Sequence, residues 1–297
     1  MSPTLRKQLL TVAAGDPSTL ASLLADRLRI EEATALDWID RGAVEVAGKR
    51  ASRTTALRPG SRILVRVPQE LPPTDAPVPS PFRIVFVDDH LLVADKAAGL
   101  LSQPSPGEGA AALEVLVRAL HPDARMLHRL DRDASGLVLF ARGDASIALQ
   151  QALVSGAIER VYRAVCVGRL DGPSTIRLRI ARDASDARRR IALPENAPGG
   201  KPAGTRITPL GPVEIGAVAG STSPTSATLV EVTLETGRTH QIRVHLAATG
   251  HPIVGDRLYG GPPAPRLLLH ATRLAFSHPV TGEAIVISSE PPADFHP

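Results

Sequence analysis

A single cysteine, Cys166, occurs among the 297 residues. One cysteine excludes an internal disulfide framework and any zinc site built from cysteine ligands, and it is typical of a reducing compartment. No uninterrupted apolar run approaches the ~18 residues that a membrane span needs, and the N-terminal residues lack the apolar core of a signal peptide. We therefore expect a soluble, cytoplasmic protein that makes no contact with a membrane.

Aromatic residues and lysines are also scarce. One Trp, two Tyr and five Phe are too few for a protein that stacks many successive bases of a single strand. Only four of the 34 basic residues are Lys, so arginine supplies most of the positive charge in a chain of net charge +4. Arginine suits bidentate contacts with phosphate or carboxylate, although the composition of a GC-rich genome gives the same bias.

Prolines are concentrated at residues 68–81, a segment that reads PQELPPTDAPVPSP. Proline fixes φ and removes backbone donors, so this segment predicts an extended, semi-rigid linker. It separates an N-terminal domain at 1–67 from a larger domain at 82–297. The N-terminal domain has a net charge of +4 and the larger domain only +2, so positive charge is densest in the small domain.

The N-terminal domain begins with helical patterns and ends with strand patterns. Leucines at 20–28 follow helical spacing, and a second helical pattern covers 31–41. Strand patterns follow at 44–51 and 62–67, the first of them with a turn at Ala47–Gly48. The sequence therefore predicts two helices packed on a small sheet.

This order of elements resembles the αL RNA-binding motif, a small domain shared by many RNA-modifying enzymes. The motif's GxVxVNGK pattern is present as GAVEVAGK at 42–49, whereas Glu31–Glu32 stand where the motif has Ser-Arg. A glutamate pair suits the positive end of a helix but repels phosphate. The alternative to RNA binding is a solvated basic face. The resemblance implies RNA contacts from Arg27, Arg41, Lys49, Arg50 and Arg53.

The larger domain has more strand patterns than helical ones, and the two types do not alternate regularly. This indicates an α+β fold, with a mixed, mainly antiparallel sheet flanked by helices and loops. Residues 183–228 are rich in Gly, Pro, Ser and Thr and predict loops. Within them, Arg188–Arg190 form either a phosphate-facing patch or part of a solvated loop.

Two segments of the larger domain combine polar and apolar residues in patterns that indicate chemistry. In HRLDRDASGLVLFAR at 128–142, Asp131 lies on a predicted turn between arginines, which suits a carboxylate held ionised beside positive charge. The segment GRTHQIRVHLAATGHPIVGDRLYG at 237–260 reads as strand-like but is dense in polar residues, which need partners when buried. A carboxylate, arginines and an amide together suit a polar, neutral, planar substrate.

These segments resemble the blocks HRLDxxTSG and GRTHQIRVHLxxxGHPIxGDxLYG of the RluA-type pseudouridine synthases. Three further blocks match in order: DKAAGLL at 95–101, RVYRAVCVG at 160–168 and LHATRLAFSHPVTGE at 269–283. Ala134 stands for a family threonine and Arg160 for a lysine. The resemblance implies a pseudouridine synthase domain that isomerises uridine in structured RNA, without cofactor or metal. The implied partner is RNA, ribosomal large-subunit RNA being favoured over transfer RNA, and we expect a monomer.

Residue by residue, the resemblance implies that Asp131 is the catalytic carboxylate and that Arg243 pairs with it. Tyr162 would lie against the uracil and assist at C5, and Arg129 would fill the gap left by the target nucleotide. A stacked uridine cannot be reached, so the base must flip out or be unpaired already. Whether the aspartate acts as nucleophile or base stays open. Further substrate or RNA contacts are expected from His128, Arg132, Arg160, Arg238, His240 and Gln241.

Other interpretations of these residues fit the patterns less well. The DRD sequence at 131–133 matches the start of a phosphatase motif, but that motif ends an apolar strand, whereas here the strand follows. His240 and His245 are five residues apart, which does not make them a natural ligand pair on a strand or a helix, so we expect no metal site. Cys166 is expected to be a packed thiol rather than a nucleophile.

A second functional class fits the same scaffold. A non-catalytic RNA-binding or ribosome-assembly factor could keep the synthase fold without its chemistry. Such a protein would have no need for the complete set of Asp131, Tyr162 and Arg243, all of which are present. The sequence therefore favours an active isomerase.

Overall fold

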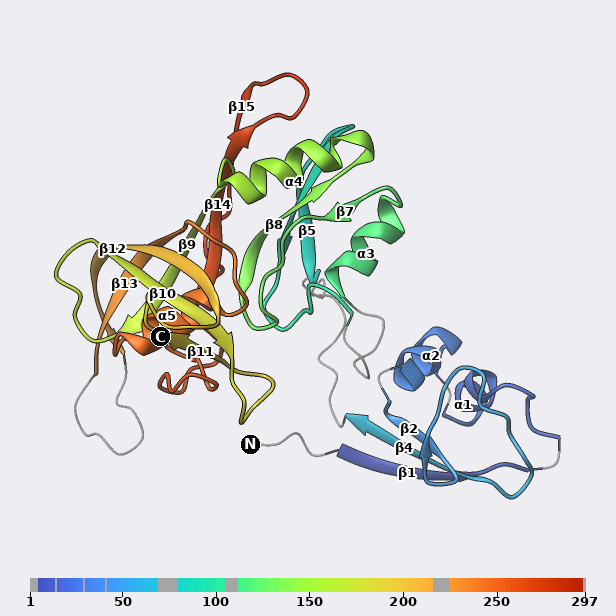
Figure 1. Cartoon of the computed structure of the whole chain (residues 1–297). Helices are drawn as coiled ribbons and strands as arrows, with labels where there is room; N and C mark the ends of the chain where they lie inside the picture. Colours follow the sequence, from blue (N-terminus) through green and yellow to red (C-terminus); the bar gives the residue numbers. More distant parts are fainter. Residues whose placement is uncertain are drawn as a thin grey trace. The chain divides into compact units, whose positions relative to one another are not determined.

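The chain forms two compact units, Met1–Val78 and Pro79–Pro297 (Figure 1). Each unit has its own apolar core. Of the predicted linker at 68–81, residues 69–79 lie outside the described part of the chain. The computed structural model describes residues 5–13, 15–28, 30–40, 42–68, 80–104, 112–215 and 225–295.

The first unit packs two helices against an antiparallel sheet of order β1-β4-β2-β3. Both helices and the turn at Ala47–Gly48 agree with the sequence prediction. The first strand was not predicted, because its sequence LRKQLLT does not alternate. The elements are β1 (Leu5–Thr11), α1 (Leu20–Leu28), α2 (Glu32–Asp40), β2 (Val44–Val46), β3 (Lys49–Arg50) and β4 (Arg62–Pro68).

The described part of the second unit is built on an 11-stranded sheet of order β11-β10-β12-β13-β9-β14-β8-β6-β5, with β15 beside β14 and β7 beside β8. All pairs are antiparallel except β14 with β8, which confirms the predicted α+β class. The elements are β5 (Phe82–Val87), β6 (Leu91–Lys96), α3 (Leu113–Leu120), β7 (Arg125–Met126), β8 (Ser135–Ala141), η1 (Gly143–Ala145), α4 (Ser146–Ser155), β9 (Glu159–Val167), β10 (Ser174–Arg182), β11 (Arg190–Leu193), β12 (Lys201–Ile215), β13 (Thr225–Leu234), α5 (Gln241–Ala248), β14 (Leu269–Ser277) and β15 (Ala284–Ser288).

The loop prediction for 183–228 is wrong for β11 and β12. The prolines and glycines of β12 lower its strand propensity, but pairing with β10 and β13 overrides that preference. Pro209 is tolerated because β12 pairs with β10 only as far as Ile207, and a bulge follows between Pro209 and Gly211.

The strand-like reading of the segment around residues 241–248 is also wrong, because this segment is the helix α5. Every side chain from Gln241 to Leu246 is buried. A helix buried on all sides has no polar face, so the sequence carries no helical periodicity there.

The strand β8 is buried at every position and separates two cores. Val138 and Phe140 pack in the core that includes residues of α3 and α5, whereas Leu137 and Leu139 pack in the core that includes residues of α4. Gly136 lets β8 approach β14 closely, since a Cβ there would lie 2.3 Å from the carbonyl oxygen of Ala271. The turn before β8 is thereby fixed against the centre of the sheet.

Candidate active site

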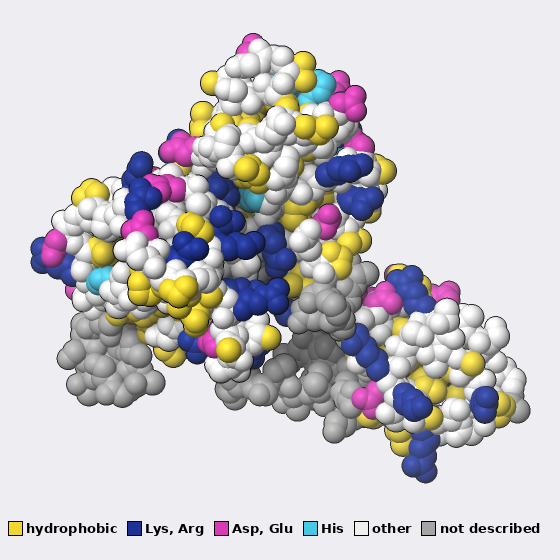
Figure 2. All heavy atoms as spheres, in the orientation of Figure 1, with side chains coloured by type: hydrophobic (Ala, Val, Ile, Leu, Met, Phe, Trp, Pro, Cys, Tyr) yellow, Lys and Arg dark blue, Asp and Glu magenta, His cyan; other side chains and the backbone are white. Residues whose placement is uncertain are grey.

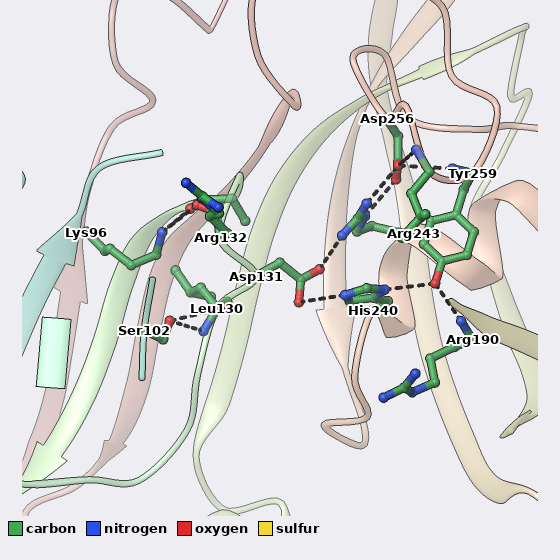
Figure 3. Close-up of polar contacts among 12 residues, drawn as sticks. Lys96, Ser102, Leu130, Asp131, Arg132, Arg190, His240, Arg243, Asp256 and Tyr259 are labelled. Atoms are coloured by element: carbon green, nitrogen blue, oxygen red, sulfur yellow. Dashed lines mark hydrogen bonds and ion pairs between the residues drawn. The ribbon is translucent and has the colours of Figure 1, made fainter. Parts of the chain in front are cut away.

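Asp131 lies on the turn that leads into β8, and two buried side chains hold this turn (Figure 3). The Oγ of Ser102 donates to the Leu130 carbonyl at 2.7 Å and accepts the Leu130 N–H at 3.1 Å. The Nζ of Lys96 donates to the carbonyl oxygens of Arg132 at 3.0 Å and Ala134 at 2.6 Å. The backbone on both sides of Asp131 is therefore fixed by side chains from the segment 96–102.

Lys96 was not among the residues predicted for the site. It is 1% exposed, and its Nζ also donates to the carbonyls of Ala97 and Leu100, both at 2.9 Å. Four carbonyl oxygens thus surround one amine, which joins the segment after β6 to the Asp131 turn. The signal in the sequence was the charged pair Asp95–Lys96 at the end of an apolar strand pattern, in the block DKAAGLL.

Arg243, on α5, joins Asp131 to a second carboxylate. Its Nη1 lies 3.0 Å from Asp131 Oδ2, while its Nε and Nη2 lie 2.7 and 2.8 Å from the two oxygens of Asp256. Asp256 is 1% exposed and also accepts the backbone N–H groups of Leu258 and Tyr259. Burial acts to lower the pKa of Arg243, but hydrogen bonds to Asp256 and the charge of Asp131 raise it above its usual value. Arg243 is thus a permanent cation aimed at Asp131.

His240, at the start of α5, lies on the same side of Asp131 as Arg243 and faces the other carboxylate oxygen (Figure 3). Its Nε2 is 3.8 Å from Asp131 Oδ1, and its Nδ1 is 2.8 Å from the Tyr259 hydroxyl, which accepts the N–H of Arg190. Burial lowers the pKa of His240, so the ring is neutral at pH 7. The contact between Nδ1 and the Tyr259 hydroxyl holds the ring with Nε2 toward Asp131.

A cavity of about 440 Å³ opens beside Asp131, and we call it the active cavity. Its wall includes Asp131, Arg160, Tyr162, His240 and Arg243. The Asp131 side chain is 17% exposed, so a molecule in the cavity can reach it. Burial raises the pKa of Tyr162 to about 12, which keeps its hydroxyl protonated. The cavity thus presents a carboxylate, a paired guanidinium and a neutral phenol to one bound group.

The chain matches the family model described as RNA pseudouridylate synthase over residues 90–248, a segment that contains Asp131, Tyr162 and Arg243. It belongs to the RNA pseudouridylate synthase family. The predicted resemblance and the predicted enzyme class, an isomerase, are thereby confirmed.

Named relatives agree with this assignment. The synthase is 34% identical over 291 residues to an uncharacterized RNA pseudouridine synthase, YhcT, of Bacillus subtilis, with 94% of this chain and 91% of the relative covered. It is 36% identical over 281 residues to the Ribosomal large subunit pseudouridine synthase D of Xanthomonas campestris pv. campestris, with 87% and 80% covered. The solved structure of Human RNA Pseudouridylate Synthase Domain Containing 1 matches with a TM-score of 0.57 and 27% identity, covering 71% of this chain and 84% of that one.

Nine of the residues predicted for the synthase's site line the active cavity, but Arg132 does not. It is exposed, and its Nε donates to the Gly99 carbonyl at 3.2 Å. The nine are His128, Arg129, Asp131, Arg160, Tyr162, Arg238, His240, Gln241 and Arg243.

Two of these nine residues support the cavity wall. Burial lowers the pKa of His128 to about 3, so the ring is neutral, and its Nε2 accepts the Leu139 N–H at 3.1 Å. Gln241 is 3% exposed and donates to the Gly204 carbonyl and the Thr205 hydroxyl, both at 2.9 Å. Its amide oxygen accepts the Thr236 hydroxyl and the Arg238 N–H. The hydrogen bonds of both side chains are therefore used within the protein.

The basic residues of the first unit that were predicted to contact RNA differ in whether their side chains already have partners within the protein. Arg27 pairs with Asp16 at 2.6 Å, and Arg53 pairs with Asp40. Arg50 donates to the Asp40 carbonyl at 3.0 Å. Lys49 is exposed, and Arg41 lies outside the described residues.

The residues that raised other interpretations have ordinary partners. His245 contacts the Thr205 hydroxyl at 2.9 Å, and Cys166 is buried with its Sγ 3.5 Å from the Thr228 carbonyl. Arg188 and Arg189 pair with Asp186 and Asp183. Within the described residues, no three potential ligands are grouped as a metal site, and no helix is long and apolar enough to cross a membrane.

Proposed function

We propose that this synthase converts uridine to pseudouridine in structured RNA, with ribosomal large-subunit RNA as the favoured substrate and transfer RNA as the second candidate. The single observation that carries the proposal is the contact between Asp131 and Arg243 in the wall of a cavity that also contains Tyr162. The favoured substrate rests on relatives named as ribosomal large subunit pseudouridine synthases.

Each residue of the active cavity has a separate role in this proposal. The target uridine leaves its stack and enters the active cavity, since its C1′, C5 and C6 are inaccessible inside a helix. Tyr162 lies against the uracil, while Arg243 orients Asp131 toward the sugar or the base. Arg129, exposed at the cavity's rim, fills the place that the base has left. The isomerisation breaks the N1–C1′ bond and forms the C5–C1′ bond, so it consumes no second substrate and needs no cofactor or metal.

Positive charge next to the active cavity supports an RNA substrate. Figure 2 shows Lys and Arg side chains gathered around the hollow of the second unit. Arg182, Arg190, Lys201 and Arg238 line an adjoining cavity of about 490 Å³ that shares residues 237–239 with the active cavity. Among the described residues, no carboxylate lies within ion-pair distance of these four side chains. Arg190 and Arg238 also donate to backbone carbonyls, but these contacts leave the positive charges available for phosphates that flank the target.

Mapping of pseudouridines tests the proposed function. Total RNA from a strain that lacks the gene should miss specific pseudouridines in large-subunit RNA, and a plasmid-borne copy should restore them. Purified protein should then form pseudouridine at the same positions in unmodified RNA. Identical maps with and without the gene, together with an inactive purified protein that still binds RNA, would support the non-catalytic assembly factor instead.

We expect the first unit to supply RNA affinity rather than chemistry, as an αL-type domain at residues 1–67 would. Removal of 1–67 should raise the apparent KM, leave kcat nearly unchanged, and flatten the salt dependence of RNA binding. The slope of the logarithm of the binding constant against the logarithm of the salt concentration should become shallower by about one for each phosphate that the first unit neutralises in the intact protein. Binding curves at several salt concentrations measure this. An unchanged slope would show that the first unit, with its paired Arg27 and Arg53, does not contact RNA.

A further inference from the structure

Arg160, near the start of β9, is a buried cation with an unused donor. It is 6% exposed and lines the active cavity, and its Nε has no hydrogen-bond partner within the described part of the chain. Among the described residues, no carboxylate lies within ion-pair distance of its guanidinium. The other buried cations differ, because Lys96 has four carbonyl partners and Arg243 has two carboxylates. A buried charge without such partners destabilises a fold. We therefore infer that a bound ligand supplies the acceptors that the Arg160 guanidinium lacks.

The strand register places the backbone of Arg160 further than that of Tyr162 from the turn that carries Asp131. Tyr162 is opposite Ala271 on β14, and Ala271 pairs with Gly136 near the start of β8. Arg160 is opposite Leu274, three residues further along β14. Because β8 and β14 are parallel and Asp131 precedes β8, Asp131, Tyr162 and Arg160 follow one another in that order. Arg160 and Tyr162 are two residues apart on one strand, so they also share a face of the sheet.

This order fits the two ends of a uridine. On the proposed function, the ribose lies at Asp131 and the uracil ring lies against Tyr162. The edge of the ring that carries the carbonyl oxygens then points toward Arg160. A guanidinium only donates hydrogen bonds, and carbonyl oxygens only accept them.

We propose that Arg160 donates hydrogen bonds to the carbonyl edge of the extruded uracil, stabilises the negative charge that forms there, and excludes cytosine. This proposal rests on the proposed function. When the N1–C1′ bond breaks, its electron pair stays on the uracil and spreads to the carbonyl oxygens. After C5 joins C1′, the C5 proton is lost and N1 gains a proton, so the atoms and charges balance. Cytosine presents an amino donor in place of the O4 acceptor and would oppose the donors of Arg160.

The first test separates this role from a structural one by comparing Arg160→Met with Lys96→Met. Both replace a buried cation with an unbranched, flexible apolar side chain. Lys96→Met leaves four carbonyls without their donor and should lower Tm. Arg160→Met should leave Tm unchanged or higher, while the single-turnover rate constant falls by about 100-fold and Arg160→Lys retains part of the rate. A Tm loss in Arg160→Met as large as that of Lys96→Met would overturn the proposal.

The second test separates a contact with the base from a contact with phosphate. Uridine 5′-monophosphate and cytidine 5′-monophosphate carry the same phosphate, and calorimetry compares their affinities for the wild-type protein and for Arg160→Met. We expect wild-type protein to prefer the uridine nucleotide and the variant to lose that preference. An equal loss of affinity for both nucleotides would place a phosphate at Arg160 and refute the proposal. Because this comparison needs no turnover, a wild-type protein that makes no pseudouridine would refute the proposed function separately.

Discussion

Replacing Asp131 with asparagine should abolish pseudouridine formation and leave the fold intact. Asparagine keeps the shape of the side chain and an oxygen that can accept from Arg243, but it lacks the charge that the proposed reaction uses. Arg243 keeps its bidentate contact with Asp256, so the core of the site is preserved. We expect the rate to fall at least about a thousandfold, which corresponds to roughly 4 kcal/mol of activation free energy. Single-turnover assays on unmodified RNA measure this.

The control for this experiment lies two residues along the same turn. Asp133 is an exposed carboxylate that does not line the active cavity, so Asp133→Asn should retain nearly full activity. RNA affinity should be similar in both variants, because neither changes a basic residue. Turnover that survives in purified Asp131→Ala would disprove the assignment of the catalytic carboxylate.

Replacing Arg243 should affect stability and activity together, because one guanidinium serves two carboxylates. Arg243→Ala leaves Asp256, 1% exposed, without its cation. Loss of one partner from a buried ion pair costs about 3–5 kcal/mol, which lowers Tm by roughly 10 °C in a domain of this size. Arg243→Lys retains the charge but cannot contact both carboxylates with the same geometry. Its Tm and its activity should therefore fall, but by less than those of Arg243→Ala. Thermal melts and kcat measure the two effects.

A double variant separates the stability effect from the catalytic one. In the double variant Arg243→Ala with Asp256→Asn, residue 256 carries no charge that needs a partner in the core. Most of the Tm that Arg243→Ala loses should therefore be recovered. Activity should stay low, because Asp131 still lacks its cation. The exposed neighbour Arg257 offers a matched control, and Arg257→Ala should change neither quantity. Recovery of activity together with Tm would mean that Arg243 acts only through the fold.

Elements with a clear apolar period could be predicted from the sequence, and elements that depend on tertiary pairing could not. The helix α1 places leucines on one buried face, and β8 is apolar from Gly136 to Ala141. The strand β12 contains Pro202, Gly204 and Pro209, and only its neighbours β10 and β13 make it a strand. The helix α5 is buried on every side, which removes the periodicity by which a helix is recognised.

The site could be predicted where matched sequence blocks contained the residues. Asp131, Tyr162 and Arg243 were predicted in this way, and the structure places all three at one cavity. Lys96 and Asp256 were missed as site residues, although both lie within matched blocks. Their importance comes from contacts across the fold: Lys96 reaches the carbonyl of Ala134, and Asp256 reaches Arg243. A sequence pattern identifies a residue type and its neighbours, but such distant pairings emerge only when the chain is folded.

The contact between Asp131 and Arg243 joins residues 112 positions apart in the chain. Closing so long a loop lowers the entropy of the chain, and packing that has already formed must offset this cost. Non-local contacts of this kind also form slowly. During synthesis, the segment with Asp131 leaves the ribosome well before α5 is made. A nascent chain that has reached β9 therefore holds Asp131 and Tyr162 but not Arg243, the cation that pairs with Asp131. The proposed active site is therefore complete only after the second half of the sheet has been made.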